Sequence, residues 1–216
     1  MTTLRRISCF ILSLCLFSAC GLIGPEAQER TVRVRLLADP KLREQDPRWS
    51  ETAAGLLRAA SNYFEREFGI RFVAQKIAPW ELEESSPFVV TLMKRLVQKY
   101  PLKDQNGSYD LIIGLTGEWV TFYFGGRGMV NRFGNCREGL GNYLVSAVTA
   151  PYRYTGPQAE LPLDVVALIH EFGHIFGAEH VKHPSSIMND DFDYRAEFDA
   201  KSREIVMKNK FCPFGK

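Results

Sequence analysis

HEFGHIFGAEH, at residues 170–180, is the most informative stretch of this 216-residue chain. It fits the pattern H-E-x-x-H-x-x-G-x-x-H. His170 and His174 are spaced i and i+4, so they project from the same face of a helix. Gly177 can take the left-handed conformation that ends a helix, and the turn that follows brings His180 back toward the other two histidines.

The spacing predicts a zinc site built from three imidazoles. Neutral imidazole is a favoured zinc ligand, and a catalytic zinc takes three protein ligands and leaves a fourth position for water. The chain holds four histidines, and the motif contains three of them. The whole pattern arises by accident in about one chain in 10⁵. We therefore expect one zinc ion on His170, His174 and His180, with His183 at the surface or behind the ligands.

A methionine lies a short way past the zinc motif in the sequence. Met188 lies eight residues past His180, in the segment SSIMND. The extended zinc motif and a downstream methionine are the two marks of the metzincin clan of zinc peptidases, and the sequence resembles that clan. In the clan the methionine packs beneath the histidine ligands without binding the metal. The resemblance implies this role for Met188, and the alternative is an ordinary core methionine.

Two subfamilies share the eight-residue spacing, the archaemetzincins and the matrixins. The string H-x-x-x-P-x-S-I-M-N is closer to archaemetzincins, but these carry cysteines where this chain has Val181 and Ser186. A second, structural zinc of the archaemetzincin kind is therefore not expected. Matrixins have Tyr-Pro after the methionine, where this chain has Asn-Asp. The chain is thus archaemetzincin-like or matrixin-like.

Glu171 directly follows the first predicted ligand. At that spacing its carboxylate shares the ligand face and can reach the fourth coordination position. Zinc lowers the pKa of its bound water toward neutrality and polarises the scissile carbonyl. Glu171 is expected to take the water proton as general base and to pass it to the departing amine. These parts predict hydrolysis of a peptide bond.

The N-terminus predicts export. Two arginines precede an apolar run at residues 7–17, and Ser-Ala-Cys follows, ending at Cys20. This pattern is typical of a secretory signal, and the run is too short to span a membrane. The Phe-Ser-Ala-Cys end resembles a bacterial lipoprotein box, which implies cleavage before Cys20 and lipid on that residue. We expect an envelope protein, anchored on the periplasmic or surface side; the alternative is simple secretion.

Three segments follow from this interpretation. They are a signal peptide at residues 1–19, a lipidated cysteine and tether at 20–30, and a catalytic domain at 31–216. Only Cys136 and Cys212 then remain, an even pair in an oxidising compartment. Their disulfide would close a loop of about 76 residues and stabilise the fold by roughly 4–5 kcal/mol in the chain-entropy model. The alternative is two free buried thiols.

Hydrophobic periodicity predicts alternating strands and helices. We expect strands at 31–38, 70–77, 109–115 and 142–149, a short strand within 125–130, and helices at 50–68, 86–100, 162–176 and 199–210. Ser50 and Asp199 are predicted N-caps, Gly69 a C-cap, and Pro162 the first residue of the zinc helix. This order resembles the metzincin catalytic domain, an α+β fold with a twisted mixed sheet, a central zinc-binding helix and a C-terminal helix.

In the clan, a short strand before the zinc helix lies at the sheet edge and pairs with the substrate. By resemblance this strand is expected at 125–130 or 141–146. The glycines of the first stretch, Gly128 among them, permit close approach of a backbone. The alternative for that stretch is a flexible surface loop.

Charge and composition limit the classes of molecule that the protein can be expected to bind. The net charge is +2, and no basic block is present, which argues against a nucleic-acid partner. We expect a peptide or protein substrate, and a membrane held through the lipid. The predicted function is a zinc peptidase, with an endopeptidase favoured and an aminopeptidase possible. The alternative is a non-catalytic, zinc-bound surface lipoprotein that acts as a binding module. Glu171 separates the two, because binding alone gives no reason for a carboxylate there.

Overall fold

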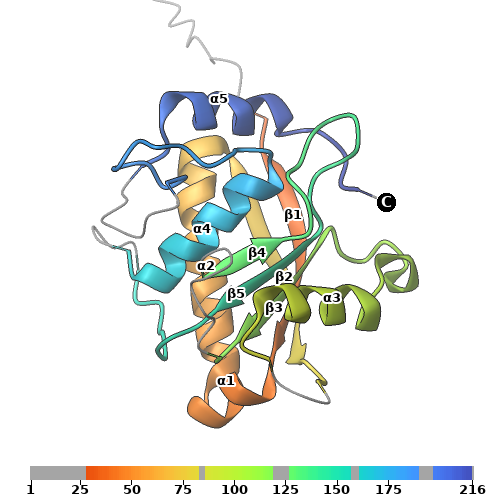
Figure 1. Cartoon of the computed structure of the whole chain (residues 1–216). Coiled ribbons are helices and arrows are strands. Elements are labelled where there is room, and N and C mark those ends of the chain that lie inside the picture. Colours follow the sequence, from red (N-terminus) through yellow and green to blue (C-terminus); the bar gives the residue numbers. More distant parts are fainter. Residues whose placement is uncertain (1–27, 83–85, 119–126, 157–160, 190–196, 216) are drawn as a thin grey trace, which may run out of the picture.

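The computed structural model describes residues 28–82, 86–118, 127–156, 161–189 and 197–215. A five-stranded sheet lies at its centre (Figure 1). The strands are β1 (Arg30–Ala38), β2 (Ile70–Pro79), β3 (Leu111–Thr116), β4 (Gly128–Val130) and β5 (Tyr143–Ala147). The helices are α1 (Pro40–Gln45), α2 (Trp49–Phe68), α3 (Val89–Lys99), α4 (Leu163–Ile175) and α5 (Ala200–Asn209), with a 3-10 turn at Leu102–Gln105.

The sheet is mixed, in the order β2-β1-β3-β5-β4. Neighbouring strands are parallel except at one edge, where β4 runs antiparallel to β5. Parallel strands need a covering layer on both faces, and the helices supply it. Helices α2 and α4 lie over one face and α3 over the other (Figure 1). The predicted α+β fold, with a mixed sheet, a central helix at the predicted zinc motif and a C-terminal helix, is confirmed.

Helix α4 lies in the larger core, against α2 and the sheet. Every residue of α4 after Leu163 is buried. Phe172 stacks on Phe72 of β2, with ring centroids 3.8 Å apart, and meets Phe64 of α2 edge-on at 5.5 Å. Such aromatic pairs add about 0.5–1.5 kcal/mol each beyond the area they bury. Residues 163–176 are apolar on most sides of the helix, which is typical of a buried helix, and the packing agrees with this.

Three predicted helix starts differ from the structure. Helix α2 begins at Trp49, so Ser50 lies inside its first turn and Arg48 is the N-cap without a side-chain cap bond. Pro162 is the N-cap of α4 rather than its first residue, and its carbonyl accepts from Val165 and Val166. Helix α3 begins at Val89, three residues later than predicted.

The short helix α1 was not predicted. The Asp39 side chain caps it by accepting from the Leu42 N–H at 2.7 Å, and Pro40 takes its first position. The same carboxylate accepts from the Thr116 hydroxyl at 2.5 Å and from the Gly117 N–H at 3.1 Å. Because Asp39 is fully buried, these partners must satisfy it, and together they join α1 to the end of β3.

The C-terminal segment closes over the end of α4. Asp199 caps α5 by accepting from the Ser202 N–H at 3.0 Å, as predicted. Cys136, in the segment between β4 and β5, is joined by a disulfide to Cys212, with Cα atoms 4.8 Å apart. Among the described residues, no helix has the length and apolarity needed to cross a membrane. The predicted signal peptide, Cys20 and most of the tether lie outside the described residues.

Candidate metal centre

The end of α4 turns sharply so that a third histidine can reach the first two. Gly177 adopts φ 92°, in the left-handed region that favours glycine. A Cβ there would also lie 2.2 Å from the Gly134 carbonyl oxygen. Both the backbone conformation and the lack of space therefore exclude a side chain at this position. The Ala178 N–H donates to the Gly173 carbonyl at 2.9 Å, which closes the turn. The chain then leads directly to His180.

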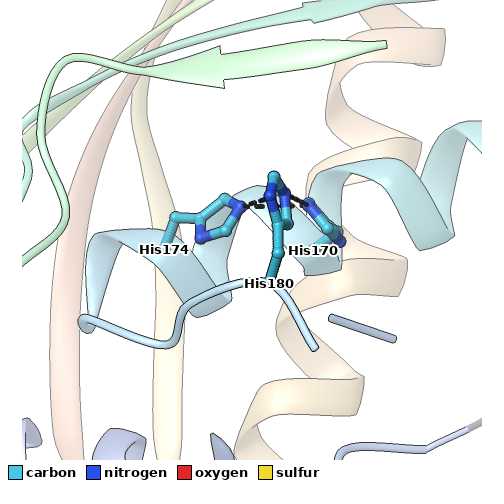
Figure 2. A group of neighbouring side chains, drawn as sticks. All are labelled: His170, His174 and His180. Atoms are coloured by element: carbon cyan, nitrogen blue, oxygen red, sulfur yellow. Dashed lines mark hydrogen bonds between the residues drawn. The ribbon is translucent and has the colours of Figure 1, made fainter. Parts of the chain in front are cut away.

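Three imidazoles meet at one point beside this turn (Figure 2). The Nε2 atom of His174 lies 3.0 Å from that of His170 and 3.1 Å from that of His180. The His170 and His180 Nε2 atoms are 3.1 Å apart. His170 and His174 are buried in α4, whereas His180 lies on the exposed segment beyond it. The three predicted ligands are therefore together, with an opening to solvent on the side of His180.

The hydrogen-bond partners of the Nδ1 atoms of His170 and His174 determine which nitrogen of each ring carries the proton. His170 Nδ1 lies 2.6 Å from the Ile187 carbonyl oxygen, and His174 Nδ1 lies 2.6 Å from the Ala178 carbonyl oxygen. A carbonyl can only accept, so each Nδ1 carries the proton and each Nε2 presents a lone pair. Metal-binding histidines are held by second bonds of this kind.

The geometry fits a zinc ion. A tetrahedral zinc with bonds of about 2.0–2.1 Å separates its nitrogen ligands by about 3.3 Å. The observed separations of 3.0–3.1 Å are close to that value. Two neutral acceptors that face each other at 3 Å share no proton, so a cation between them removes an unfavourable contact. The donor set is the one that catalytic zinc prefers.

Burial keeps His174 in the form that binds a metal. It lowers the pKa of His174 to about 4, below the usual 6.5, and the nearby His180 acts in the same direction. The hydrogen bond to the Ala178 carbonyl opposes them. At neutral pH the imidazole is therefore uncharged.

Met188 lies beneath the ligand helix. It is fully buried, and its Sδ atom would lie 2.5 Å from a Cβ placed on Gly173. Gly173 stands between the two histidines of α4, so only the missing side chain lets the methionine pack there. The backbone around it also holds the site, because the Val181 N–H donates to the Met188 carbonyl at 3.0 Å.

The side chain of Glu171 extends from α4 toward the edge strand β4. Its side chain is 5% exposed. A Cβ on Gly128 would lie 2.8 Å from Glu171 Oε1 and 2.7 Å from its Cγ. The first residue of β4 therefore has to be a glycine for the carboxylate to occupy this position. The short strand predicted within 125–130 is β4, and it does lie at the sheet edge.

Two further residues complete the surroundings. His183 lies outside the cluster, with its Nδ1 3.0 Å from the Ser185 hydroxyl, as expected for a surface residue. Phe133 was not singled out by the sequence, yet its ring stacks on His174 with centroids 4.4 Å apart and an interplanar angle of 8°. No local pattern marks Phe133, because the segment between β4 and β5 meets α4 only in the folded chain.

The family is decided by a comparison of the whole sequence. Residues 28–214 match the Reprolysin_5 model, described as metallo-peptidase family M12. The chain belongs to metallopeptidase family M12. It is a metzincin-type zinc metallopeptidase, with the three-histidine cluster on its central helix.

A solved structure shares the fold of this M12 metallopeptidase. The chain is similar to the crystal structure of archaemetzincin from Methanopyrus kandleri, with 19% sequence identity and a TM-score of 0.56. The match covers 88% of this chain and 99% of the archaemetzincin chain. At this identity the likeness concerns the fold alone. No curated protein matches the chain by sequence.

The cluster predicts which histidine substitution abolishes metal binding. Zinc at a hundred-fold excess over its Kd should raise the Tm of the wild-type protein by about 5–10 °C. H180A should lose most of this rise, because it removes one of three ligands. The matched control H183A should keep it. Thermal melts with and without zinc, together with metal analysis, measure both. An H180A protein that retains stoichiometric zinc would contradict the assignment.

Proposed function

We propose that this M12 metallopeptidase is an endopeptidase in which Glu171 is the general base, held at the bacterial cell envelope by a lipid on Cys20. The observation that carries the catalytic part is the position of Glu171. Glu171 directly follows His170 on the ligand helix, and its buried carboxylate lies against Gly128 of β4. Burying a carboxylate is costly unless it is hydrogen-bonded or paired, so a carboxylate kept in a buried position calls for a function. A catalytic base next to a metal-bound water is such a function.

A zinc ion held by His170, His174 and His180 would supply a Lewis acid that polarises the scissile carbonyl and activates the attacking water. Glu171 accepts the proton of that water on a carboxylate oxygen while the water oxygen bonds to the carbonyl carbon. The carboxyl group then delivers the proton to the amine nitrogen as the C–N bond breaks. Placing the base on the ligand helix fixes its distance from the ligands, which is the orienting part of catalysis.

The edge strand supports a role in holding an extended peptide. Met129 pairs with Val145, and the flanking bonds join Ala147 N–H to Arg127 and Asn131 N–H to Tyr143. Antiparallel pairs alternate, so the backbone groups of Gly128 and Val130 point away from β5. Within the described residues β4 pairs with β5 alone. These outward groups can pair with a substrate added as a further strand.

The same strand favours an endopeptidase over the alternatives. A substrate peptide paired with β4 is bound through its own backbone groups and extends past the metal centre in both directions. This arrangement favours cleavage of peptide bonds within the substrate chain. An aminopeptidase instead needs a group that holds the free amine. Peptides with blocked and free N-termini separate these two activities. A binding module without catalysis does not need Glu171 next to the ligands.

The role of Glu171 is tested by a pair of glutamine variants. E171Q should bind zinc like the wild type but cleave peptides about 10²–10⁴-fold more slowly, because the amide cannot accept the water proton. The matched control is E179Q, since Glu179 lies in the same motif but is exposed. Cleavage rates and zinc content of the three proteins decide the matter. Equal cleavage by wild type and E171Q would refute the mechanism.

The lipid anchor rests on the N-terminal sequence. A charged start, a short apolar run and the Phe-Ser-Ala-Cys end are together typical of a bacterial lipoprotein signal. Lipidation would place the catalytic domain next to a membrane through a short tether. Two acyl signals on one cysteine are enough for stable anchoring, whereas a single chain is marginal.

Labelling with palmitate tests the anchor. In bacteria that express the full chain, the wild type should incorporate the label and fractionate with membranes. C20S should lose both properties, because no other residue fits the lipid site. C15S, which changes a cysteine inside the apolar run, should stay labelled. A C20S protein that is labelled like the wild type would refute the anchor, and release of the wild type into the medium would favour secretion.

A further inference from the structure

Phe133 is a large apolar side chain that remains half exposed next to the metal centre. It is 47% exposed, although its ring lies parallel to the His174 imidazole. It also meets the His180 ring edge-on, with centroids 6.5 Å apart. Single exposed apolar residues are common on protein surfaces and need no explanation. This one differs in its place, because it borders two of the three ligands.

The backbone holds Phe133 in this place. The next residue, Gly134, donates its N–H to the His174 carbonyl at 3.0 Å. Gly141, at the other end of the same segment, donates to the Ile175 carbonyl at 3.3 Å. Between them, Cys136 forms the disulfide with Cys212. The ring therefore sits on a segment that is clamped to the end of α4, and rigid support of this kind suits a binding residue.

The course of the chain links Phe133 to the substrate strand. Strand β4 begins at Gly128, against Glu171, and its outward backbone groups end at Val130. Three residues later the chain reaches Phe133 on His174. The edge that would pair with a peptide thus leads from Glu171, at Gly128, toward the ring of Phe133 beside His174. A peptide on β4 would pass the exposed side of that ring.

We propose that Phe133 selects the substrate: it contacts a bulky apolar or aromatic side chain of the peptide, on one side of the scissile bond. The inference rests on the proposed function, since it requires a peptide on β4. One face of the ring is already covered by His174, so the remaining surface is an apolar platform for one side chain. A contact between two such rings is worth about two- to twelve-fold in affinity, beyond the effect of the apolar area that it buries.

A different role for the same ring has to be told apart. Phe133 could act only through His174, by holding the imidazole in its orientation. Removing the ring would then weaken zinc binding, or slow every substrate equally. A specificity residue instead changes the ratio between substrates and leaves the metal in place.

The test uses zinc-loaded E171Q protein, so that binding is measured without cleavage. Its affinity is measured for peptides that differ only by Phe, Leu or Ala at one position, taken in turn on each side of the scissile bond. Adding F133A should weaken the Phe and Leu peptides about five- to ten-fold at one position and leave the Ala peptides within about two-fold. Adding F88A, which removes an equally exposed ring at the start of α3, should change nothing. Zinc content should be equal throughout.

Other results overturn the inference. They are equal weakening of all peptides by F133A, loss of zinc from that variant, no change in selectivity at any position, or no binding of any peptide. Wild-type protein that cleaves none of these peptides, while E171Q still binds them with Phe133-dependent selectivity, would refute the proposed function and leave only the contact between Phe133 and a bound peptide standing.

Discussion

Three imidazole Nε2 atoms that face one point, about 3 Å from one another, are the constraint on which this structure depends. Two carbonyl oxygens, on Ile187 and Ala178, hold the protons of His170 and His174 on the far side of those rings, so these two Nε2 atoms present lone pairs to the centre. A cation at the centre relieves the repulsion between these lone pairs. Metal binding and the folded state are therefore coupled, and the ligand cluster is stable to the extent that the metal is bound.

Several distant segments of the fold hold the C-terminal end of α4 in place. A helix leaves its last carbonyl groups without partners, and the metal ligands of α4 lie in that last stretch. Here the carbonyls of His174 and Ile175 accept from Gly134 and Gly141, and that of Phe176 accepts from the Asn209 side chain at 2.9 Å. The segment after β4 and the helix α5 thus both hold the site, and the disulfide between Cys136 and Cys212 joins them.

Most of the parts that were predicted from sequence are governed by local rules. The motif at residues 170–180 specifies its own helix, its turn at Gly177 and three converging rings, because each depends on neighbours within ten residues. The N-caps were less predictable. Ser50 is a good cap by type, but Trp49 already belongs to α2, and it packs against the core. Phe133 and the clamp on α4 could not be found, since their contacts join segments about forty residues apart.

The central claim is that one zinc ion lies between His170, His174 and His180. Anomalous diffraction at the zinc absorption edge, from crystals grown with zinc, tests it most directly. We expect a single strong peak within the cluster, about 2.0–2.1 Å from each of the three Nε2 atoms. Three rings that point apart, or zinc density elsewhere in the molecule and none in the cluster, would contradict the account.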